Sequence, residues 1–274
     1  MDNLFDLTER VAIITGGAGL LGQKHAEAIA SQGGIPILID LAEAEPKIKA
    51  KKIAEKYHVE ALGVAVDITQ PDQIQKLLEE VISHYNRVDI LVNNAANNPK
   101  VEDSLSKQAW HRLEDFPMSV WEADIRVGLT GAFLCCQIIG SELARRKNGV
   151  IVNVASDLAV IAPDQRIYRQ AGLPEEQQPV KPVTYSVVKT GIIGLTRYLA
   201  TYWATSGVRV NAITPGGVYN NQPDEFVKRL SNLIPLSRMA HVDEYKGAIL
   251  FLCSDASSYM TGSNLIIDGG KSCW

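Results

Sequence analysis

The sequence contains few residues of the kinds that mark disulfide frameworks or metal sites. Four cysteines occur in 274 residues, and no two of them have the spacing of a metal-binding pair. Cys135 and Cys136 are adjacent in an apolar segment, which is typical of small core residues. The five histidines are scattered singly along the chain. We therefore expect reduced thiols, a cytoplasmic location and no metal site.

Long apolar segments and basic clusters are also missing. No uninterrupted apolar run reaches the roughly 20 residues of a transmembrane helix, and the first residues lack the basic and then apolar pattern of a signal peptide. The net charge is −4, without a long basic run. These absences predict no membrane partner and no nucleic-acid partner. Hydrophobic residues make up 46% of the chain and charged residues 21%, which is typical of a globular protein with a sizeable core.

The chain does have a regular alternation of short apolar runs with longer amphipathic stretches. The apolar runs are rich in Val and Ile without polar alternation, as expected of strands buried on both faces. This alternation is typical of an α/β fold with a doubly wound parallel sheet. No linker or internal repeat is evident, so we predict one domain over residues 1–274. The predicted strands are 10–16, 35–40, 61–67, 88–95, 149–156, 208–214 and 264–270, and the predicted helices are 20–33, 46–58, 71–85, 118–147 and 184–207.

A glycine-rich segment, TGGAGLLG at residues 15–22, joins the first predicted strand to the first predicted helix. In a dinucleotide-binding fold this turn holds a pyrophosphate against the helix N-terminus, with glycines allowing close backbone approach. The second predicted strand ends in Asp40, whose carboxylate could accept hydrogen bonds from adenosine ribose hydroxyls and would repel a 2′-phosphate. No basic residue follows before Lys47, which favours NAD over NADP. Alternatively, Asp40 could cap the next helix.

Tyr185 and Lys189 are four positions apart in the segment PVTYSVVKTG. On a helix, positions i and i+4 share a face, and an ammonium beside a phenol favours the phenolate. Such a pair could exchange a proton near neutral pH. Taken alone, the spacing is more typical of one aromatic residue and one surface charge on an ordinary helix. The interpretation therefore depends on the rest of the chain.

Several motifs, in order and over almost the whole chain, resemble the short-chain dehydrogenase/reductase superfamily. They are the glycine segment, VDI containing Asp67, NNAA at 93–96, NVAS ending at Ser156, YSVVK, and NAITPGG ending at Gly217. The resemblance implies a single-domain Rossmann fold, with seven parallel strands, helices on both faces, and cofactor and catalytic site on one subunit. It also implies a homo-oligomer, a dimer or tetramer packed through the long helices, that acts on a small-molecule substrate.

The resemblance also implies roles for individual residues. Ser156 would hydrogen-bond the substrate oxygen, Tyr185 would give or take its proton, and Lys189 would lower the pKa of the tyrosine and bind the nicotinamide ribose. Asp67 would contact adenine, and the turn from Pro215 to Val218 would cover the nicotinamide. The predicted cofactor is NAD, and the residues predicted to bind it are Gly16, Gly19, Leu20, Leu21, Gly22, Asp40, Asp67, Ile68, Asn93, Ala95, Tyr185, Lys189, Pro215, Gly216 and Val218.

Three features depart from the family pattern. Leu20 stands where the family usually has the second glycine of the loop. Gly128 stands where many members have an asparagine, which in the family holds a water that links the lysine to solvent. We expect that the helix is distorted here and that a backbone carbonyl holds this water instead, or else that a neighbouring polar side chain does. Insertions at about 97–117 and 157–183 follow strands at their carboxyl ends, which is the ligand edge of such sheets. We expect the second insertion to be a substrate lid, the alternative being a solvated decoration.

The two insertions are polar and suit a polyhydroxylated substrate, either neutral or anionic, better than a steroid or a fatty acyl chain. Other segments resemble a branch associated with bacterial sugar and surface-glycan biosynthesis. We predict an NAD(H)-dependent oxidoreductase that interconverts a hydroxyl and a carbonyl on a sugar or sugar derivative. The alternatives are an enzyme similar to 3-oxoacyl carrier-protein reductases, which usually take NADPH, and a catalytically impaired dinucleotide-binding protein. The insertion residues expected to face the substrate are Trp110, His111, Arg112, Asp157, Gln165, Arg166, Tyr168, Arg169 and Gln170.

Overall fold

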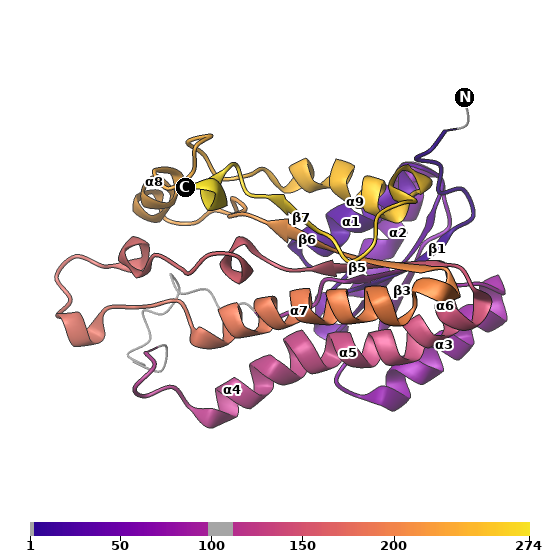
Figure 1. The fold of residues 1–274 in the computed structure, drawn as a ribbon, viewed down its shortest axis with the longest axis horizontal. Helices are drawn as coiled ribbons and strands as arrows, with labels where there is room; N and C mark the ends of the chain where they lie inside the picture. The colour runs from indigo at the N-terminus through magenta and orange to yellow at the C-terminus, as the bar shows by residue number, and fades with distance from the viewer. Residues whose placement is uncertain (1–2, 98–111) are drawn as a thin grey trace.

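A seven-stranded sheet forms the centre of the molecule (Figure 1). The computed structural model describes residues 3–97 and 112–274. Within them the strand order is β3-β2-β1-β4-β5-β6-β7, and every neighbouring pair is parallel. The predicted doubly wound α/β fold is therefore confirmed. The strands are β1 (Val11–Thr15), β2 (Ile35–Asp40), β3 (Leu62–Ala65), β4 (Ile90–Asn93), β5 (Gly149–Val154), β6 (Val208–Pro215) and β7 (Asn264–Ile267).

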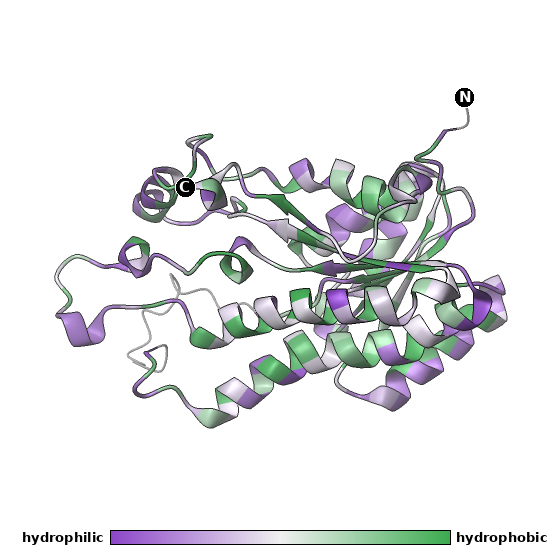
Figure 2. Ribbon diagram, in the orientation of Figure 1, coloured by the Kyte–Doolittle hydropathy of each residue, from purple (hydrophilic) through white to green (hydrophobic). Residues whose placement is uncertain are grey.

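Both faces of the sheet are buried, which explains why its strands lack polar alternation. In β1, Val11 and Ile13 pack into one apolar cluster, whereas Ala12 and Ile14 pack into another. Successive side chains of a strand point to opposite faces, so these two clusters are the cores on the two sides of the sheet. Figure 2 shows hydrophobic residues along the strands of the sheet.

Two layers of helices cover the sheet. The helices on the two faces contribute to different apolar clusters. One face carries α1 (Leu20–Ala30), α2 (Pro46–Tyr57) and α9 (Lys246–Cys253), and the other carries α3 (Pro71–Tyr85), α7 (Val183–Tyr202) and the helix from Met118 to Arg146. Helix α8 (Asp224–Ser231) lies apart from these layers and packs against the 3₁₀ turn Gln165–Tyr168.

The helix from Met118 to Arg146 is continuous but not uniform. Its α-helical parts are α4 (Met118–Ile125), α5 (Ala132–Cys135) and α6 (Ser141–Arg146), separated by π-helical segments at Arg126–Gly131 and Cys136–Gly140. By length and composition alone this helix could cross a membrane, although it contains no uninterrupted apolar run of that length. Core helices of soluble proteins can have the same length and composition, and 44% of the most apolar stretch of this helix is buried within the protein.

A chain of buried side-chain hydrogen bonds ties β4, β5 and α7 together. The Nδ2 of Asn93 donates to the Oδ1 of Asn153 at 2.9 Å, and the Nδ2 of Asn153 donates to the Oγ1 of Thr196 at 2.9 Å. The Thr196 hydroxyl donates in turn to the carbonyl oxygen of Ile192 at 2.8 Å. Asn153 is fully buried. The network therefore fixes the helix that carries Tyr185 and Lys189 against the middle of the sheet.

Replacing Asn153 with alanine should lower the free energy of unfolding by about 1–3 kcal/mol, because Asn93 and Thr196 are left short of a buried partner. Urea denaturation measures the change. Asn232→Ala, at an exposed position, is the control and should change the value by no more than about 0.5 kcal/mol. Equal effects of the two substitutions would show that the network contributes nothing.

Candidate active site

A cavity of about 660 Å³ opens at the carboxyl edge of the sheet, where the strand order reverses between β1 and β4. Such reversal points are the usual ligand sites of open α/β sheets. Two of the predicted site residues, Gly22 and Asn93, do not line this cavity. The predicted residues that line it are Gly16, Gly19, Leu20, Leu21, Asp40, Asp67, Ile68, Ala95, Ser156, Tyr185, Lys189, Pro215, Gly216 and Val218.

The glycine loop after β1 makes a tight turn that depends on glycine at two positions. Gly16 has a φ of +60°, a left-handed conformation that other residues rarely adopt. A Cβ on Gly22 would come within 2.1 Å of the Gly16 carbonyl oxygen, so a glycine at position 22 allows α1 to pack directly against the loop. Leu20, in place of the expected glycine, is 42% exposed and begins α1. The N-terminus of α1 therefore meets the cavity, as in folds that hold a pyrophosphate there.

Asp40 ends β2 and lines the cavity. Its Oδ2 accepts a hydrogen bond from the Ala18 backbone at 3.1 Å, and its Oδ1 accepts one from the Leu41 backbone at 2.9 Å. The alternative role as a helix cap is not seen, because the 3₁₀ turn Ala42–Ala44 is preceded by Leu41 and has no side-chain cap. The carboxylate thus links the second strand to the glycine loop and faces the cavity.

The structure corrects the prediction for Asn93. Its side chain donates to Asn153 in the core, as described above, and also approaches the Sγ of Cys136 at 3.2 Å. The neighbouring Asn94 lines the cavity instead, and its Nδ2 donates to the carbonyl oxygens of Thr15 and Gly16 at 3.0 Å. The alternation of β4 could have revealed this, since a side chain two positions after the buried Leu91 faces the same core.

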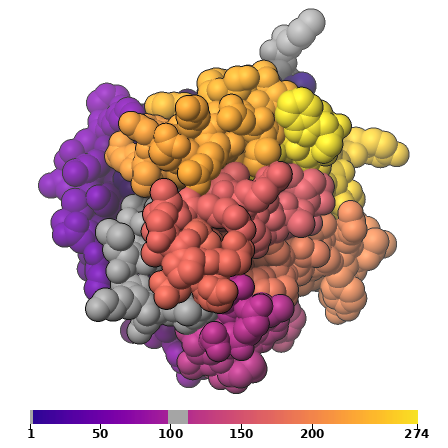
Figure 3. Space-filling view, turned by 90° about the vertical axis from the view of Figure 1, so that its left-hand side faces the viewer, coloured from indigo at the N-terminus to yellow at the C-terminus, as the bar shows by residue number. Residues whose placement is uncertain are grey.

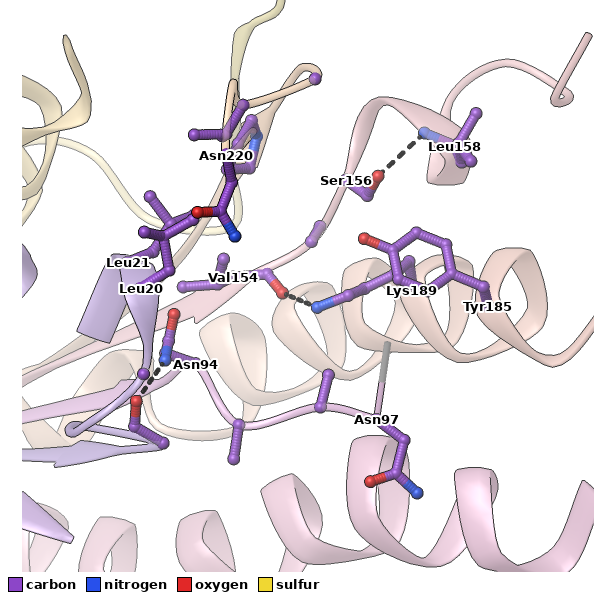
Figure 4. Close-up of a pocket in the computed structure, with 18 of the residues that line it drawn as sticks. Leu20, Leu21, Asn94, Asn97, Val154, Ser156, Leu158, Tyr185, Lys189 and Asn220 are labelled. Carbon is purple, nitrogen blue, oxygen red and sulfur yellow. Dashed lines mark hydrogen bonds between the residues drawn. The ribbon is translucent and has the colours of Figure 1, made fainter. Parts of the chain in front are cut away.

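Ser156, Tyr185 and Lys189 meet at the wall of the cavity that follows β5. Ser156 comes directly after β5 and Ala155, and the other two lie on successive turns of α7. Figure 4 shows the tyrosine hydroxyl on the side of Ser156. The Nζ of Lys189 donates to the carbonyl oxygen of Val154 at 2.7 Å and lies 5.9 Å from the centroid of the Tyr185 ring. The predicted catalytic groups are thus brought together.

The charges around these groups differ from the expectation. Burial lowers the pKa of Lys189 from its ordinary 10.5 to about 8, and the positive charge of Lys181 adds to the effect. Burial raises the pKa of Tyr185, the hydrogen bond with Ser156 opposes this rise, and the negative charge of Asp157 adds to it. The expectation that Lys189 lowers the pKa of Tyr185 is therefore not met by this geometry. The lysine itself can exchange a proton near neutral pH.

Lys271, close to the end of the chain, also lines the cavity and was not predicted. Its Nζ donates to the Oδ2 of Asp157 at 2.8 Å, and both side chains are less than 10% exposed. The two residues are 114 positions apart, and no sequence pattern connects them.

Gly128, in place of the expected asparagine, lies in the π-helical segment Arg126–Gly131. The helix is therefore distorted there, as predicted. A Cβ at this position would lie 2.5 Å from the Cγ1 of Val188, which stands between Tyr185 and Lys189 on α7. The absence of a side chain thus allows α7 to pack closely against the long helix.

The second insertion, residues 157–183, is folded against the rest of the molecule. Figure 3 shows this segment in the middle of the face that it shares with α8. Its Ile167 packs with Leu230 of α8, and Ile167, Tyr168 and Lys181 line the cavity. The insertion is therefore part of the wall around the site.

Several insertion residues expected to face the substrate do not line the cavity. Arg166 pairs with Asp164 and Arg169 pairs with Glu175, each at 2.6 Å on the surface. Arg112 donates to the Glu175 carbonyl oxygen at 3.0 Å and so joins the two insertions. Gln165 and Gln170 make hydrogen bonds within the insertion. Of the nine residues, Trp110 and His111 lie outside the described residues, and Asp157 and Tyr168 line the cavity.

Family models match both halves of the chain. One described as "short chain dehydrogenase" matches residues 10–169, and one described as "Enoyl-(Acyl carrier protein) reductase" matches residues 175–272. The first covers more than half of the sequence. This chain belongs to the short-chain dehydrogenase family. It is an oxidoreductase, and its family supports binding of a nicotinamide dinucleotide.

Individual relatives include enzymes that act on polyols. The chain is 34% identical to an NAD-dependent glycerol dehydrogenase of Listeria innocua, with 98% of this chain and 96% of the relative covered. It is 33% identical to an NADP-dependent mannitol dehydrogenase of Alternaria alternata, with 98% and 95% covered. It is 31% identical to a 3-oxoacyl-[acyl-carrier-protein] reductase of Aquifex aeolicus, with 96% and 98% covered.

A solved structure with the same fold is a gluconate 5-dehydrogenase from Burkholderia cenocepacia, in complex with NADP and tartrate. Its TM-score to this chain is 0.85 at 25% identity, with 99% of this chain and 98% of that chain covered. The relatives thus include both NAD- and NADP-dependent enzymes.

The contact at Gly128 predicts a coupled effect of two substitutions. Gly128→Ala should lower the free energy of unfolding by about 1–3 kcal/mol through overpacking against Val188. In a Val188→Ala background the same substitution should lower the free energy of unfolding by clearly less, because the space for the added methyl group is then open. Urea denaturation of the four proteins of this cycle measures the difference. The same cost in both backgrounds would show that this contact does not require glycine.

Proposed function

We propose that this chain is an NAD(H)-dependent dehydrogenase that interconverts a hydroxyl and a carbonyl on a sugar or sugar derivative. The observation that carries the proposal is one cavity lined by Ser156, Tyr185 and Lys189 on one side of the strand-order reversal and by Asp40 on the other. The residues fit a nicotinamide dinucleotide, because a glycine loop at a helix N-terminus and a carboxylate after β2 suit its pyrophosphate and its adenosine ribose.

Asp40 supports NAD rather than NADP. Its side chain lines the cavity in a partly exposed position, and Lys47, the first basic residue after it, lies within α2. A 2′-phosphate placed near this carboxylate would meet like charge, whereas ribose hydroxyls can donate hydrogen bonds to it.

The chemistry assigned to the catalytic residues follows from their positions. Tyr185 takes the proton of the substrate hydroxyl during oxidation as the phenolate, and it returns that proton during reduction as the phenol. Ser156 positions the substrate oxygen through a hydrogen bond, for which its O–H turns from Asp157 to that oxygen. Lys189, held by the Val154 carbonyl oxygen, supplies positive charge on the same helix face as Tyr185. NAD⁺, when bound, accepts the hydride that leaves the substrate carbon.

The wall beside Ser156 supports a substrate with several oxygens. Asp157 and Lys271 line it from one side, and Asn220 and Gln222 line it from the loop after β6. Asp157 and Lys271 are buried, whereas Asn220 and Gln222 are partly exposed. Polar groups placed at a cavity wall can hydrogen-bond to the hydroxyl groups of a ligand. The names of the glycerol, mannitol and gluconate enzymes among the relatives agree with this choice.

Two alternative functions can be separated from the proposed one by experiment. A 3-oxoacyl carrier-protein reductase is favoured by the Aquifex aeolicus relative and opposed by Asp40. A dinucleotide-binding protein without catalysis is favoured by Gly128, which replaces the usual asparagine of the family. It is opposed by the proximity of Ser156, Tyr185 and Lys189 in one cavity wall. NAD-dependent oxidation of polyols, compared with NADPH-dependent reduction of a 3-oxoacyl thioester, separates the three possibilities.

We further propose a cytoplasmic homo-oligomer, a dimer or tetramer, without membrane or nucleic-acid partners. Tyr198 and Tyr202 on α7 are each 63% exposed and stack with ring centroids 5.7 Å apart. Phe133 of α5 is 45% exposed. Exposed aromatic residues on long helices are suited to a subunit interface.

Removing the charge of Asp40 should weaken the preference for NAD. Asp40→Asn keeps an acceptor for the Ala18 backbone and loses the like-charge repulsion, so the ratio of the NADP to NAD dissociation constants should fall by about tenfold. Fluorescence titration measures both constants. Glu43→Gln, an exposed carboxylate on the next turn, should leave the ratio unchanged. Wild-type protein that binds NADP more tightly than NAD would refute the cofactor assignment.

Tyr185→Phe should lower kcat about 10²- to 10⁴-fold, since the proton loses its acceptor. The dissociation constant for NAD should stay within a few-fold of wild type. Steady-state oxidation of glycerol or mannitol measures kcat, and Tyr259→Phe, at a fully exposed tyrosine, serves as control. Near-full activity of Tyr185→Phe would mean that the proton leaves by another group.

A further inference from the structure

Asp157 and Lys271 form a buried chain of polar contacts that ends at Ser156. The Ser156 hydroxyl donates to the Oδ1 of Asp157 at 2.9 Å, and the Leu158 backbone donates to the same oxygen at 3.0 Å. The other carboxylate oxygen, Oδ2, accepts from the Nζ of Lys271 at 2.8 Å. One carboxylate therefore separates the lysine from the predicted catalytic serine.

The fold holds Lys271 in this place by the turn that precedes it. Gly269 and Gly270 have φ values of +68° and +89°, which bend the chain directly after β7 and Asp268. The Asp268 carboxylate then accepts hydrogen bonds from the backbones of Gly270 at 2.9 Å and Ser272 at 2.8 Å. Lys271 is only 8% exposed, so its side chain points inward from a fixed turn.

The ammonium of Lys271 has more donors than the described part of the protein uses. It carries three N–H groups, and Asp157 is the acceptor found among residues 3–97 and 112–274. Its side chain lines the same cavity as Ser156 and Tyr185. Buried N–H groups are normally hydrogen-bonded, so the remaining donors of this ammonium can bind acceptor oxygens of a ligand in the cavity.

We propose that Lys271 is a substrate-binding residue that recognises a second hydroxyl, adjacent to the one that reacts, in a 1,2-diol or polyol. The inference rests on the proposed dehydrogenase function and names its substrate class. A hydroxyl in this position accepts a hydrogen bond from Lys271 and can donate one to Asp157. The pair is neutral as a whole, so it fits a neutral diol better than a carboxylate. Asp157 is a positioning residue, since it orients the Ser156 hydroxyl.

The test compares two alcohols of the same carbon skeleton, 2,3-butanediol and 2-butanol, in NAD-dependent oxidation. Lys271→Met should raise KM for the diol about 10- to 100-fold, the worth of a charge-assisted hydrogen bond. It should leave KM for 2-butanol and the dissociation constant for NAD within about twofold. Calorimetric titration of the enzyme–NADH complex with the diol should show the same loss of affinity. Lys228→Met, at an exposed lysine of α8, should change none of these values.

A structural role for the pair gives a different result. If Lys271 only anchors the end of the chain, Lys271→Met lowers the melting temperature and impairs both alcohols and NAD binding alike, which overturns the proposal. Because that variant leaves Asp157 unpaired, the double variant Lys271→Met/Asp157→Asn is also needed. The double variant should fold and should lose the lower KM for 2,3-butanediol relative to 2-butanol, even if kcat is lower for both alcohols. A double variant that keeps the preference for the diol overturns the proposal.

Failure of the inference about Lys271 and failure of the proposed dehydrogenase function give different results. Wild-type protein that oxidises both alcohols equally well is still a dehydrogenase, but one in which Lys271 does not recognise a second hydroxyl. Wild-type protein that oxidises neither alcohol nor any polyol with NAD refutes the proposed function. If the NADH complex then fails to bind the diol in the calorimeter, the inference about Lys271 is refuted with it.

Discussion

The parallel pairing of β1 with β4 is the interaction on which the site depends. Its register places Ala12 opposite Ile90 and Ile14 opposite Val92, so the two strands end level with each other. The glycine loop after β1 and the segment after β4 therefore lie side by side, joined by the hydrogen bonds of Asn94. A register slip of one residue would turn each side chain of a strand to the opposite face. The cavity would then lose its wall at the point of strand-order reversal.

Close backbone approach is the second constraint on the site. Gly22 lets α1 start against the carbonyl oxygen of Gly16, and Gly128 lets α7 approach the long helix. An asparagine at position 128 would occupy the space that Val188 fills, so the packing of α7 and the usual family residue exclude each other here. A small cavity of about 10 Å³, lined by Gly128 and by the predicted catalytic residues Tyr185 and Lys189, remains between the helices. The glycine thus shapes the surroundings of the predicted catalytic pair.

Much of this arrangement could be predicted from local sequence. Asp40 and Ser156 each end or directly follow an apolar strand, and parallel strands end at one edge, so their common cavity follows from the fold class. Tyr185 and Lys189 share a helix face through their spacing alone. Lys271 could not be found in this way, because its contact with Asp157 depends on a turn after the last strand. The direction of the pKa shift of Tyr185 could not be predicted from the sequence either, because it depends on the burial of the phenol and on its contacts with Ser156 and Asp157 in the folded wall.

The buried Asp157–Lys271 pair needs an explanation beyond stability. Removing two charges from water costs several kcal/mol per ion, and apolar side chains of similar size often stabilise a fold as well or better. Here the positive member is 8% exposed at the wall of a cavity, and the negative member fixes the direction of the Ser156 hydroxyl. A donor kept out of bulk water forms a stronger hydrogen bond to an oxygen that enters the cavity. It also penalises a hydrocarbon of the same size, which would leave the donor unpaired. In the proposed function, the buried pair therefore contributes selectivity for a substrate rich in oxygen rather than stability of the fold.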